Sequence, residues 1–297
     1  MRVLIVTAVP AERDAVVRGV GATAPELAEL PVPGGMLHRL SPAPPTGPPL
    51  TVDVLAAGVG PAAAAAGTAA ALTAAAVARA PYDLAVSAGI GGGFSTGRAA
   101  AAGPAVTAPG ATGPEATGPG DAGPEAAGPV ATATARPTTP APVTAHLGSV
   151  VVADAIVAAD LGAETPDGFA AVTDLGFGTV EHLPPAPLVA AVAEATDAVR
   201  GTVLTVSTVT GSAERAAELL RRHPRAVAEA MEGFGVAEAA AAQAVPALEV
   251  RTVSNAVGPR DRAAWRIGEA LEALTGAFAT IAPLLGTWTF DPEGTRQ

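Results

Sequence analysis

The chain contains no cysteine and no lysine, and aromatic residues make up only 3% of its 297 residues. The absence of cysteine excludes disulfide bridges, zinc–thiolate sites and thiol nucleophiles. The shortage of aromatic rings leaves few candidates for a surface on which a nucleobase stacks. Every basic residue is an arginine. Together with the excess of alanine, proline and glycine, this indicates GC-rich codons rather than a function.

Positive charge and long apolar runs are also scarce. The net charge of −11 argues against a nucleic-acid partner, because phosphate binding needs concentrated basic residues. The start, MRVLIVTAVPAERD, becomes charged too soon for a signal peptide. The alanine run near 62–80 is helical and weakly hydrophobic, and no apolar run reaches the roughly 20 residues that a membrane helix needs. We expect a soluble, cytoplasmic protein with no membrane partner.

Strand and helix patterns alternate along most of the chain. β-Branched and apolar runs predict strands, and helical patterns lie between them, the first opened by Pro10. The predicted strands are 3–9, 50–60, 82–94, 149–160, 201–212 and 247–257, and the predicted helices are 10–20, 61–80, 212–224, 226–243 and 261–285. This alternation predicts a three-layer α/β fold with a mostly parallel, mixed central sheet flanked by helices, in a single domain spanning 1–297.

Residues 97–145 do not fit this alternation. They contain ATGPEATGPGDAGPEAAGP, a Pro/Gly/Ala-rich segment with an imperfect short repeat. Such a composition buries too little apolar area to offset the entropy of ordering. We interpret the segment as a disordered, low-complexity insertion within the domain; a role as a partner tether is the less favoured alternative.

Polar and glycine-rich residues follow several predicted strands. Ligands of parallel α/β sheets bind beyond the carboxyl ends of the strands. The residues at those ends are Glu12, Gly58-Val59-Gly60, the loop 87–93, Thr210-Gly211-Ser212 and Asn255. The four histidines are scattered without ligand spacing. The sequence therefore predicts a small-molecule site with no metal and no cofactor.

Two glutamates are candidates for chemistry, and each has a structural alternative. Glu12 lies in the first turn of its predicted helix, where it would complement the helix dipole or act as a general base. Glu232, on the predicted helix 226–243, shares a small apolar face with Ala228 and Val236. It would accept hydrogen bonds from a ribose diol or pair with an arginine. Trp265 and Phe234 would pack on a ligand or belong to the core.

Six segments in this order resemble the nucleoside phosphorylase/nucleosidase superfamily, and within it the methylthioadenosine/S-adenosylhomocysteine nucleosidase branch. The resemblance covers most of the chain outside 97–145. The segments are the first strand with Glu12, LAAGVGPAAAAAGT, VSAGIGGGF, LGSVVVADAIVAAD, AMEGFGVAEAA and RTVSNAV. The last segment departs from the branch, in which this strand normally ends in Ser-Asp. The resemblance implies a nucleoside phosphorylase-like fold and an N-glycosyl hydrolase that forms a homo-oligomer.

The resemblance also implies roles for individual residues. Glu12 matches the base that activates water, and Met231 and Glu232 match the ribose-binding pair. The residues that match the segments beside ribose and purine are Ser87, Ala88, Gly89, Thr208 and Val209. The branch often has an aromatic residue where Thr208 stands, and Phe234 would substitute for it in stacking.

Asn255 stands where the adenine-specific enzymes have an aspartate. Adenine presents a donor at N6 and an acceptor at N7, which a protonated aspartic acid matches. Hypoxanthine presents acceptors at O6 and N7, to which an amide NH₂ donates. Asn255 therefore predicts a 6-oxopurine nucleoside with hypoxanthine as the released base, unless Asn255 is only a turn residue. Because Asn255 cannot act as an acid, the proton for the purine must come from elsewhere.

Three other functions fit the same pattern less well. A phosphorylase needs a phosphate site with arginines, whereas the loop Ser87–Phe94 has none and Glu12 would repel phosphate. An adenine-specific nucleosidase is disfavoured by Asn255. A nonenzymatic binding protein would be expected to lose Glu12 or Glu232. The resemblance further implies a 5′ substituent with a carboxylate, for which Arg39, Arg260, Arg262 and Arg266 are candidate partners.

Overall fold

The computed structural model describes residues 1–22, 26–42, 49–94 and 144–288, and these residues belong to one compact unit. Their centre is a ten-stranded mixed sheet, in the order β11-β10-β6-β12-β5-β1-β4-β3-β2, with β9 paired to β6. The strands are β1 (Arg2–Thr7), β2 (Leu27–Val32), β3 (Gly35–Leu40), β4 (Thr51–Ala56), β5 (Leu84–Gly93), β6 (Val150–Ala158), β9 (Glu181–His182), β10 (Val199–Thr205), β11 (Ala226–Ala230) and β12 (Ala247–Ala256). A separate hairpin consists of β7 (Gly162–Thr165) and β8 (Gly168–Ala171).

One half of the sheet closes on itself. β11 runs parallel to β10 and also pairs antiparallel with the end of β5, where Glu229 lies opposite Gly92. Glycine permits this approach, because a Cβ at Gly91 would lie 2.9 Å from the carbonyl oxygen of Glu229. The strands β5, β12, β6, β10 and β11 therefore form a closed ring of pairings. The ring brings the ends of β5, β11 and β12 together.

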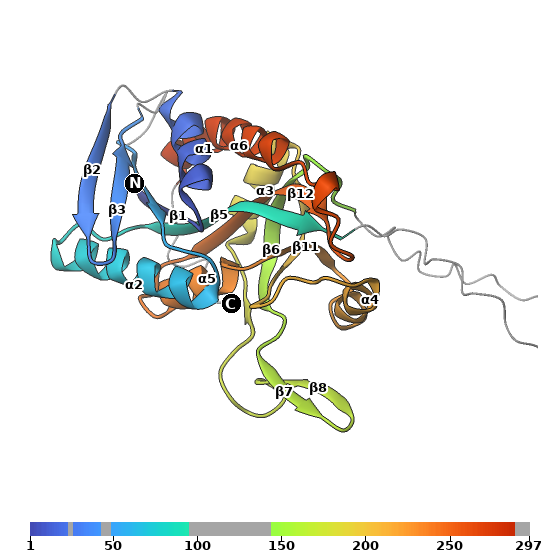
Figure 1. Cartoon of the computed structure of the whole chain (residues 1–297). Helices are drawn as coiled ribbons and strands as arrows, with labels where there is room; N and C mark the ends of the chain where they lie inside the picture. The colour runs from blue at the N-terminus through green and yellow to red at the C-terminus, as the bar shows by residue number, and fades with distance from the viewer. Residues whose placement is uncertain (23–25, 43–48, 95–143, 289–297) are drawn as a thin grey trace, which may run out of the picture. The chain divides into compact units, whose positions relative to one another are not determined.

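Helices cover both faces of the sheet (Figure 1). They are α1 (Pro10–Gly21), α2 (Pro61–Val77), α3 (Ala186–Thr196), α4 (Ala213–Arg222), α5 (Gly233–Ala241) and α6 (Ile267–Thr287), with a 3-10 turn η1 (Arg262–Ala264). The helices α1, α3 and α6 pack on one core cluster, and α2 packs with α5 on the opposite side. The predicted three-layer α/β fold with a mixed central sheet is thus confirmed, and α1 begins at Pro10 as predicted.

Three parts of the sequence interpretation differ from the structure. Residues 226–230, predicted as the start of a helix, form the buried strand β11, and α5 begins only at Gly233. The helical face that was assigned to Glu232 therefore does not exist. The alanine-rich segment misled the prediction because alanine suits a helix, while tertiary pairing with β10 and β5 imposes a strand. Helix α3 and the hairpins β2–β3 and β7–β8 were not predicted.

Helix α6 is longer and more apolar than the sequence analysis expected of any segment. It is the one helix among the described residues that is long and apolar enough to cross a membrane by length and composition alone. Its apolar face carries Leu274, Phe278 and Ile281, which are fully buried in the core shared with α1 and the sheet. This packing is that of a core helix.

The predicted insertion 97–145 lies almost wholly outside the described residues and stays a prediction. Its last residue, Ala145, is described and is buried in the core cluster beside Val253. The predicted range therefore extends too far at its C-terminal end.

Candidate active site

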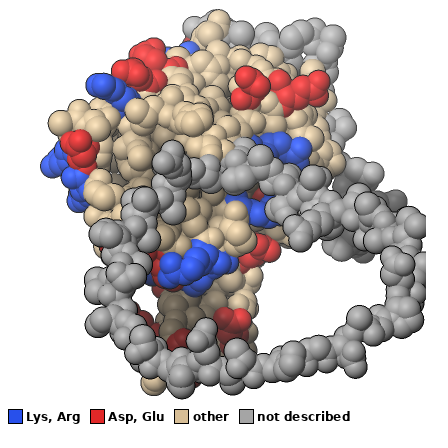
Figure 2. Space-filling view, turned by 90° about the vertical axis from the view of Figure 1, so that its right-hand side faces the viewer, with Lys and Arg blue, Asp and Glu red and all other residues tan. Residues whose placement is uncertain are grey.

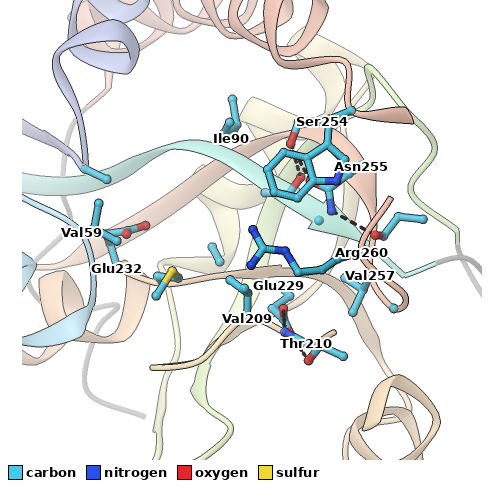
Figure 3. A pocket seen from close by; sticks show the side chains of 18 of the residues that line it. Val59, Ile90, Val209, Thr210, Glu229, Glu232, Ser254, Asn255, Val257 and Arg260 are labelled. Carbon is cyan, nitrogen blue, oxygen red and sulfur yellow. Dashed lines mark hydrogen bonds between the residues drawn. The ribbon is translucent and has the colours of Figure 1, made fainter. Parts of the chain in front are cut away.

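A cavity of about 360 Å³ opens where the ends of β1, β5, β11 and β12 meet (Figure 3). Its wall is mostly apolar, with a few polar side chains that converge on it. The polar and charged side chains that line it are Glu12, Thr210, Glu229, Glu232, Ser254, Asn255 and Arg260. A concave, largely apolar cavity with a few placed polar groups is typical of a small-molecule site.

Glu12 combines a structural position with a place in the cavity wall. It is the third residue of α1, and its Oε2 accepts hydrogen bonds from the backbone N–H groups of Ala8 (3.0 Å) and Val9 (3.3 Å). Its Oε1 accepts from the N–H of Ile90 at 2.9 Å. Burial raises the pKa of Glu12, and the positive charge of Arg251 partly opposes that shift. A carboxylate with a raised pKa is a stronger base once it is ionised.

Glu232 lies at the junction between β11 and α5, not on a helix. Its Oε1 accepts from the N–H of Gly60 at 3.1 Å, and its Oε2 lies 3.3 Å from Nη1 of Arg251. Glu232 therefore pairs with an arginine, which was the structural alternative. It also lines the cavity, and its contact with a ribose diol stays a prediction. The carboxylate is held from two sides before any ligand contacts it.

Arg251, which the sequence analysis missed, is the centre of this arrangement. Its side chain is fully buried, and Nε donates to Glu249 (2.9 Å) while Nη2 donates to Ser87 Oγ (2.7 Å). We call Glu12, Glu232, Glu249 and Arg251 the Arg251 cluster. Burial also raises the pKa of Glu249, again opposed by Arg251. Three carboxyl groups therefore lie around one guanidinium, and two of them, Glu12 and Glu232, line this end of the cavity.

Gly89 permits the closeness of the Arg251 cluster. A Cβ at this position would lie 2.6 Å from Oε1 of Glu12 and 2.7 Å from Nη1 of Arg251. Any side chain larger than hydrogen would push the base and the guanidinium apart.

Asn255 lies in the cavity wall near the end of β12, as predicted. Its Oδ1 accepts from the hydroxyl of Ser254 at 2.8 Å, and its Nδ2 donates to the carbonyl oxygen of Ala256 at 3.0 Å. An amide nitrogen carries two protons. Each end of the amide has one bond inside the protein, so the second N–H of Nδ2 remains available to donate to a ligand.

Glu229 and Thr210 form a further polar pair in the wall. Both carboxylate oxygens of Glu229 accept from Thr210, one from the backbone N–H at 2.8 Å and the other from the hydroxyl. Burial raises the pKa of Glu229. Sequence analysis missed this residue because the segment was interpreted as a helix.

The structure brings together some of the predicted site residues and not others. Glu12, Val209, Met231, Glu232 and Asn255 line the cavity. Ser87, Ala88 and Gly89 do not line it; they lie fully buried or packed behind it, where Ser87 supports Arg251.

The predicted roles of Thr208 and Phe234 in base contact are not supported by their positions. Thr208 is exposed and does not line the cavity. Phe234 contacts His182 in a tilted arrangement, with ring centroids 5.2 Å apart, and it lines a separate cavity of about 260 Å³. The aromatic residue in the main cavity wall is Trp265 instead.

The four arginines proposed as partners of a 5′ carboxylate lie in different places. Arg260 lines the cavity, whereas Arg262 and Arg266 do not. Arg39 forms a two-pronged ion pair with the buried Asp53, through Nε and Nη2, both at 2.7 Å. Within the described ranges no group of three or more His, Asp or Glu residues is arranged to hold a metal ion.

Comparison with known proteins places this geometry in a family. A model of the phosphorylase superfamily matches residues 143–283. The chain resembles 5′-methylthioadenosine/S-adenosylhomocysteine nucleosidase from Neisseria meningitidis, solved in complex with methylthio-immucillin-A, with a TM-score of 0.64 at 15% identity; the match covers 97% of this chain and 99% of that one. This likeness shows that the chain shares the fold of that nucleosidase.

Two sequence relatives define the family more narrowly. The chain is 58% identical to futalosine hydrolase of Streptomyces coelicolor over 288 residues, which is 97% of this chain and 98% of that protein. It is 38% identical to futalosine hydrolase of Acidothermus cellulolyticus over 299 residues, 98% of this chain and 93% of that protein. The chain therefore belongs to the phosphorylase superfamily and, within it, to the futalosine hydrolase family.

Proposed function

We propose that this N-glycosyl hydrolase cleaves the N-glycosidic bond of futalosine, giving hypoxanthine and dehypoxanthinyl futalosine in the biosynthesis of menaquinone. The observation that carries the proposal is the 58% identity to a futalosine hydrolase over 97% of the chain. The cavity supports it with a buried carboxylate at one end and an amide donor at the other.

Glu12 is the proposed general base. Its two oxygens are oriented by three backbone N–H groups, and its raised pKa makes it a better acceptor of a proton from water. N-Glycosidic cleavage develops positive charge on the ribose, as glycoside hydrolysis does in general. The anionic excess of the Arg251 cluster stabilises that charge, and Glu232 accepts from the ribose hydroxyls.

Asn255 is the residue proposed to recognise the purine. The free N–H of Nδ2 donates to O6 or N7 of hypoxanthine, both of which are acceptors. N7 is an acceptor in adenine as well, so discrimination arises where the N–H faces position 6: there adenine presents its N6 donor, and a buried donor without a partner costs free energy. Met231 and Val209 supply apolar contact for ribose and base.

The arrangement favours water over phosphate as the nucleophile. A phosphorylase would need free cationic groups near Glu12, but Arg251 is fully buried and its nitrogens are engaged by Glu249, Glu232 and Ser87. With three carboxylates around one arginine, a phosphate anion would be repelled. This is the physical reason for preferring hydrolysis.

The proposal also covers the localisation, oligomeric state and partners of the enzyme. We infer a soluble, cytoplasmic homo-oligomer without nucleic-acid or membrane partners and without a metal or cofactor. The net charge of −11 supports this, as do the small groups of arginines scattered among acidic side chains on the face in Figure 2. The burial of the apolar face of α6 supports the absence of a membrane partner.

The test is base release in phosphate-free buffer. Purified protein is incubated separately with futalosine, inosine and methylthioadenosine, and the released base is identified by chromatography. We expect hypoxanthine from futalosine, little from inosine, and no adenine from methylthioadenosine. Release of adenine would contradict the role of Asn255, and release that requires phosphate would remove the water-activating role from Glu12.

A further inference from the structure

Arg260 is a cation in the cavity wall to which the proposed reaction has so far assigned no part. Three features of the chain position it. Gly258 has φ +138°, a conformation that favours glycine, and Pro259 follows it, so the chain turns sharply after β12. The stem of Arg260 then passes the loop after β10, where a Cβ at Gly211 would lie 4.0 Å from its Cγ.

The guanidinium is held but not neutralised. Its Cζ lies 5.4 Å from the centroid of the Trp265 ring, a cation–π contact that restrains the side chain without removing its charge. Within the described part of the chain, Arg260 forms no ion pair with a carboxylate, although Glu229 lines the same cavity. Glu229 directs both of its oxygens to Thr210 instead.

The two ends of the cavity therefore differ in the charged group that is left for a ligand: on one side Glu229 is engaged by Thr210 and Arg260 stays free of an ion pair, and the other side holds Glu12 and Glu232. Figure 3 shows Glu232 and Val59 on one side, while Arg260 projects into the cavity on the side of Asn255 and Glu229. The side of Glu232 carries the Arg251 cluster. A cation on the other side suits the group that becomes negative during the reaction.

Resting on the proposed function, we propose that Arg260 is a catalytic and specificity-determining residue that donates to the O6/N7 edge of the purine and stabilises the departing purine anion. When the C1′–N9 bond breaks, its electron pair passes to the purine. The oxygen of water bonds to C1′, and Glu12 takes one proton from that water and releases it to solvent. The purine anion takes a proton from solvent after departure, so the net reaction consumes one water molecule.

This role explains how the reaction proceeds with an asparagine where the adenine-specific enzymes have an acid. Arginine keeps its proton under all physiological conditions, so it supplies fixed positive charge rather than a proton. A fixed donor aimed at developing negative charge is an efficient form of transition-state stabilisation. Adenine offers N6 donors on this edge, which a guanidinium repels.

The experiment compares Arg260→Ala with Arg262→Ala, each assayed with futalosine and with inosine, which lacks the 5′ carboxylate. Arg262 is the matched control, because its Cζ lies 5.7 Å from the same Trp265 ring but its side chain does not line the cavity. We expect Arg260→Ala to lower kcat for futalosine about 100-fold, near the lower end for such donors because the side chain is exposed, and to lower the slow turnover of inosine as well. It should also weaken hypoxanthine binding measured by calorimetry, and Arg262→Ala should match the wild type.

Two results would overturn the proposal. A loss confined to KM for futalosine, with inosine unaffected, would mean that Arg260 binds the 5′ carboxylate. Unchanged kcat and unchanged hypoxanthine binding would mean that Arg260 takes no part. Failure of the proposed function is distinct, because it appears in the wild type as no release of hypoxanthine from futalosine.

Discussion

Two groups of charged side chains, one built around the buried Arg251 and the other around the buried Asp53, have opposite ratios of acidic to basic groups. In the Arg251 cluster three carboxylates share one guanidinium. In the second group, the Asp53 cluster (Asp53, Arg2, Arg39 and Tyr82), one carboxylate accepts from two arginines and from the tyrosine hydroxyl at 2.6 Å. The Asp53 cluster satisfies its anion fully, and burial and the neighbouring Asp53 raise the pKa of Tyr82. We infer that a satisfied cluster joins strands, whereas an excess of one charge prepares a site for chemistry.

The largest expected effect is that of Glu12→Gln. It removes the proposed base, so kcat should fall about 1,000-fold or more. Both oxygens of Glu12 accept backbone N–H groups, so the amide NH₂ of glutamine leaves at least one of these donors unpaired, at a cost of about 1–3 kcal/mol in stability. Steady-state kinetics and urea denaturation measure the two effects. Asp14→Asn is the control, since Asp14 lies on the same helix, is exposed and forms its ion pair with the neighbouring Arg13. Turnover within ten-fold of the wild type would contradict the assignment.

Replacing one arginine in each cluster should destabilise the protein by different amounts. Arg251→Met leaves buried carboxylates without their cation and should lower the free energy of unfolding by about 3–5 kcal/mol. Arg39→Met should cost about 1–3 kcal/mol, because Asp53 keeps Arg2 and Tyr82. Urea denaturation at neutral pH measures both. Equal losses of unfolding free energy in the two variants would mean that the ratio of carboxylates to arginines in a cluster does not determine how much its arginine stabilises the fold.

A methyl group at Gly89 should disturb the Arg251 cluster without changing any charge. Gly89→Ala places a Cβ against Glu12 and Arg251, so we expect about 1–3 kcal/mol of destabilisation and lowered kcat. Gly276→Ala is the control. Nothing lies within 4 Å of a Cβ at this position on α6, and the change should stabilise the protein by up to about 1 kcal/mol. If Gly89→Ala kept the kinetics of the wild type, catalysis would not depend on the close approach of Glu12 and Arg251.

The smallest effect is a displaced pH profile. Catalysis requires ionised Glu12, whose pKa lies above 4.5 because of burial. The acid limb of kcat/KM should therefore fall above that pH. A raised pKa in the folded state means that the stability from this group is present below pH 4.5 and is lost as pH rises through the folded pKa. An acid limb at or below pH 4.5 would contradict a buried base.

Much of the fold and part of the site followed from the sequence. Apolar β-branched runs and Pro10 located β1 and α1, and strand-end reasoning located Glu12 and Asn255. The interpretation of 226–230 failed because an alanine-rich strand is defined by its partners, which a local pattern does not contain. Glu229 and the true position of Glu232 were lost with it.

Arg251 was missed although the sequence carried a signal. Glu249 and Arg251 are two residues apart in a strand, so both side chains project from the same face, and opposite charges on one face of an apolar run indicate a buried ion pair. Arg260 was named only as one of four candidates. Its separation from Arg262 and Arg39 depends on a turn and on packing against Gly211 and Trp265, which no spacing rule encodes.

The central claim is that the anionic Arg251 cluster activates water and excludes phosphate. The most direct measurement is the mass of the sugar product formed from futalosine in ¹⁸O-labelled water, with and without added phosphate. We expect ¹⁸O at C1′ and the same rate in both buffers. A phosphorylated sugar, or turnover that begins only when phosphate is added, would contradict it.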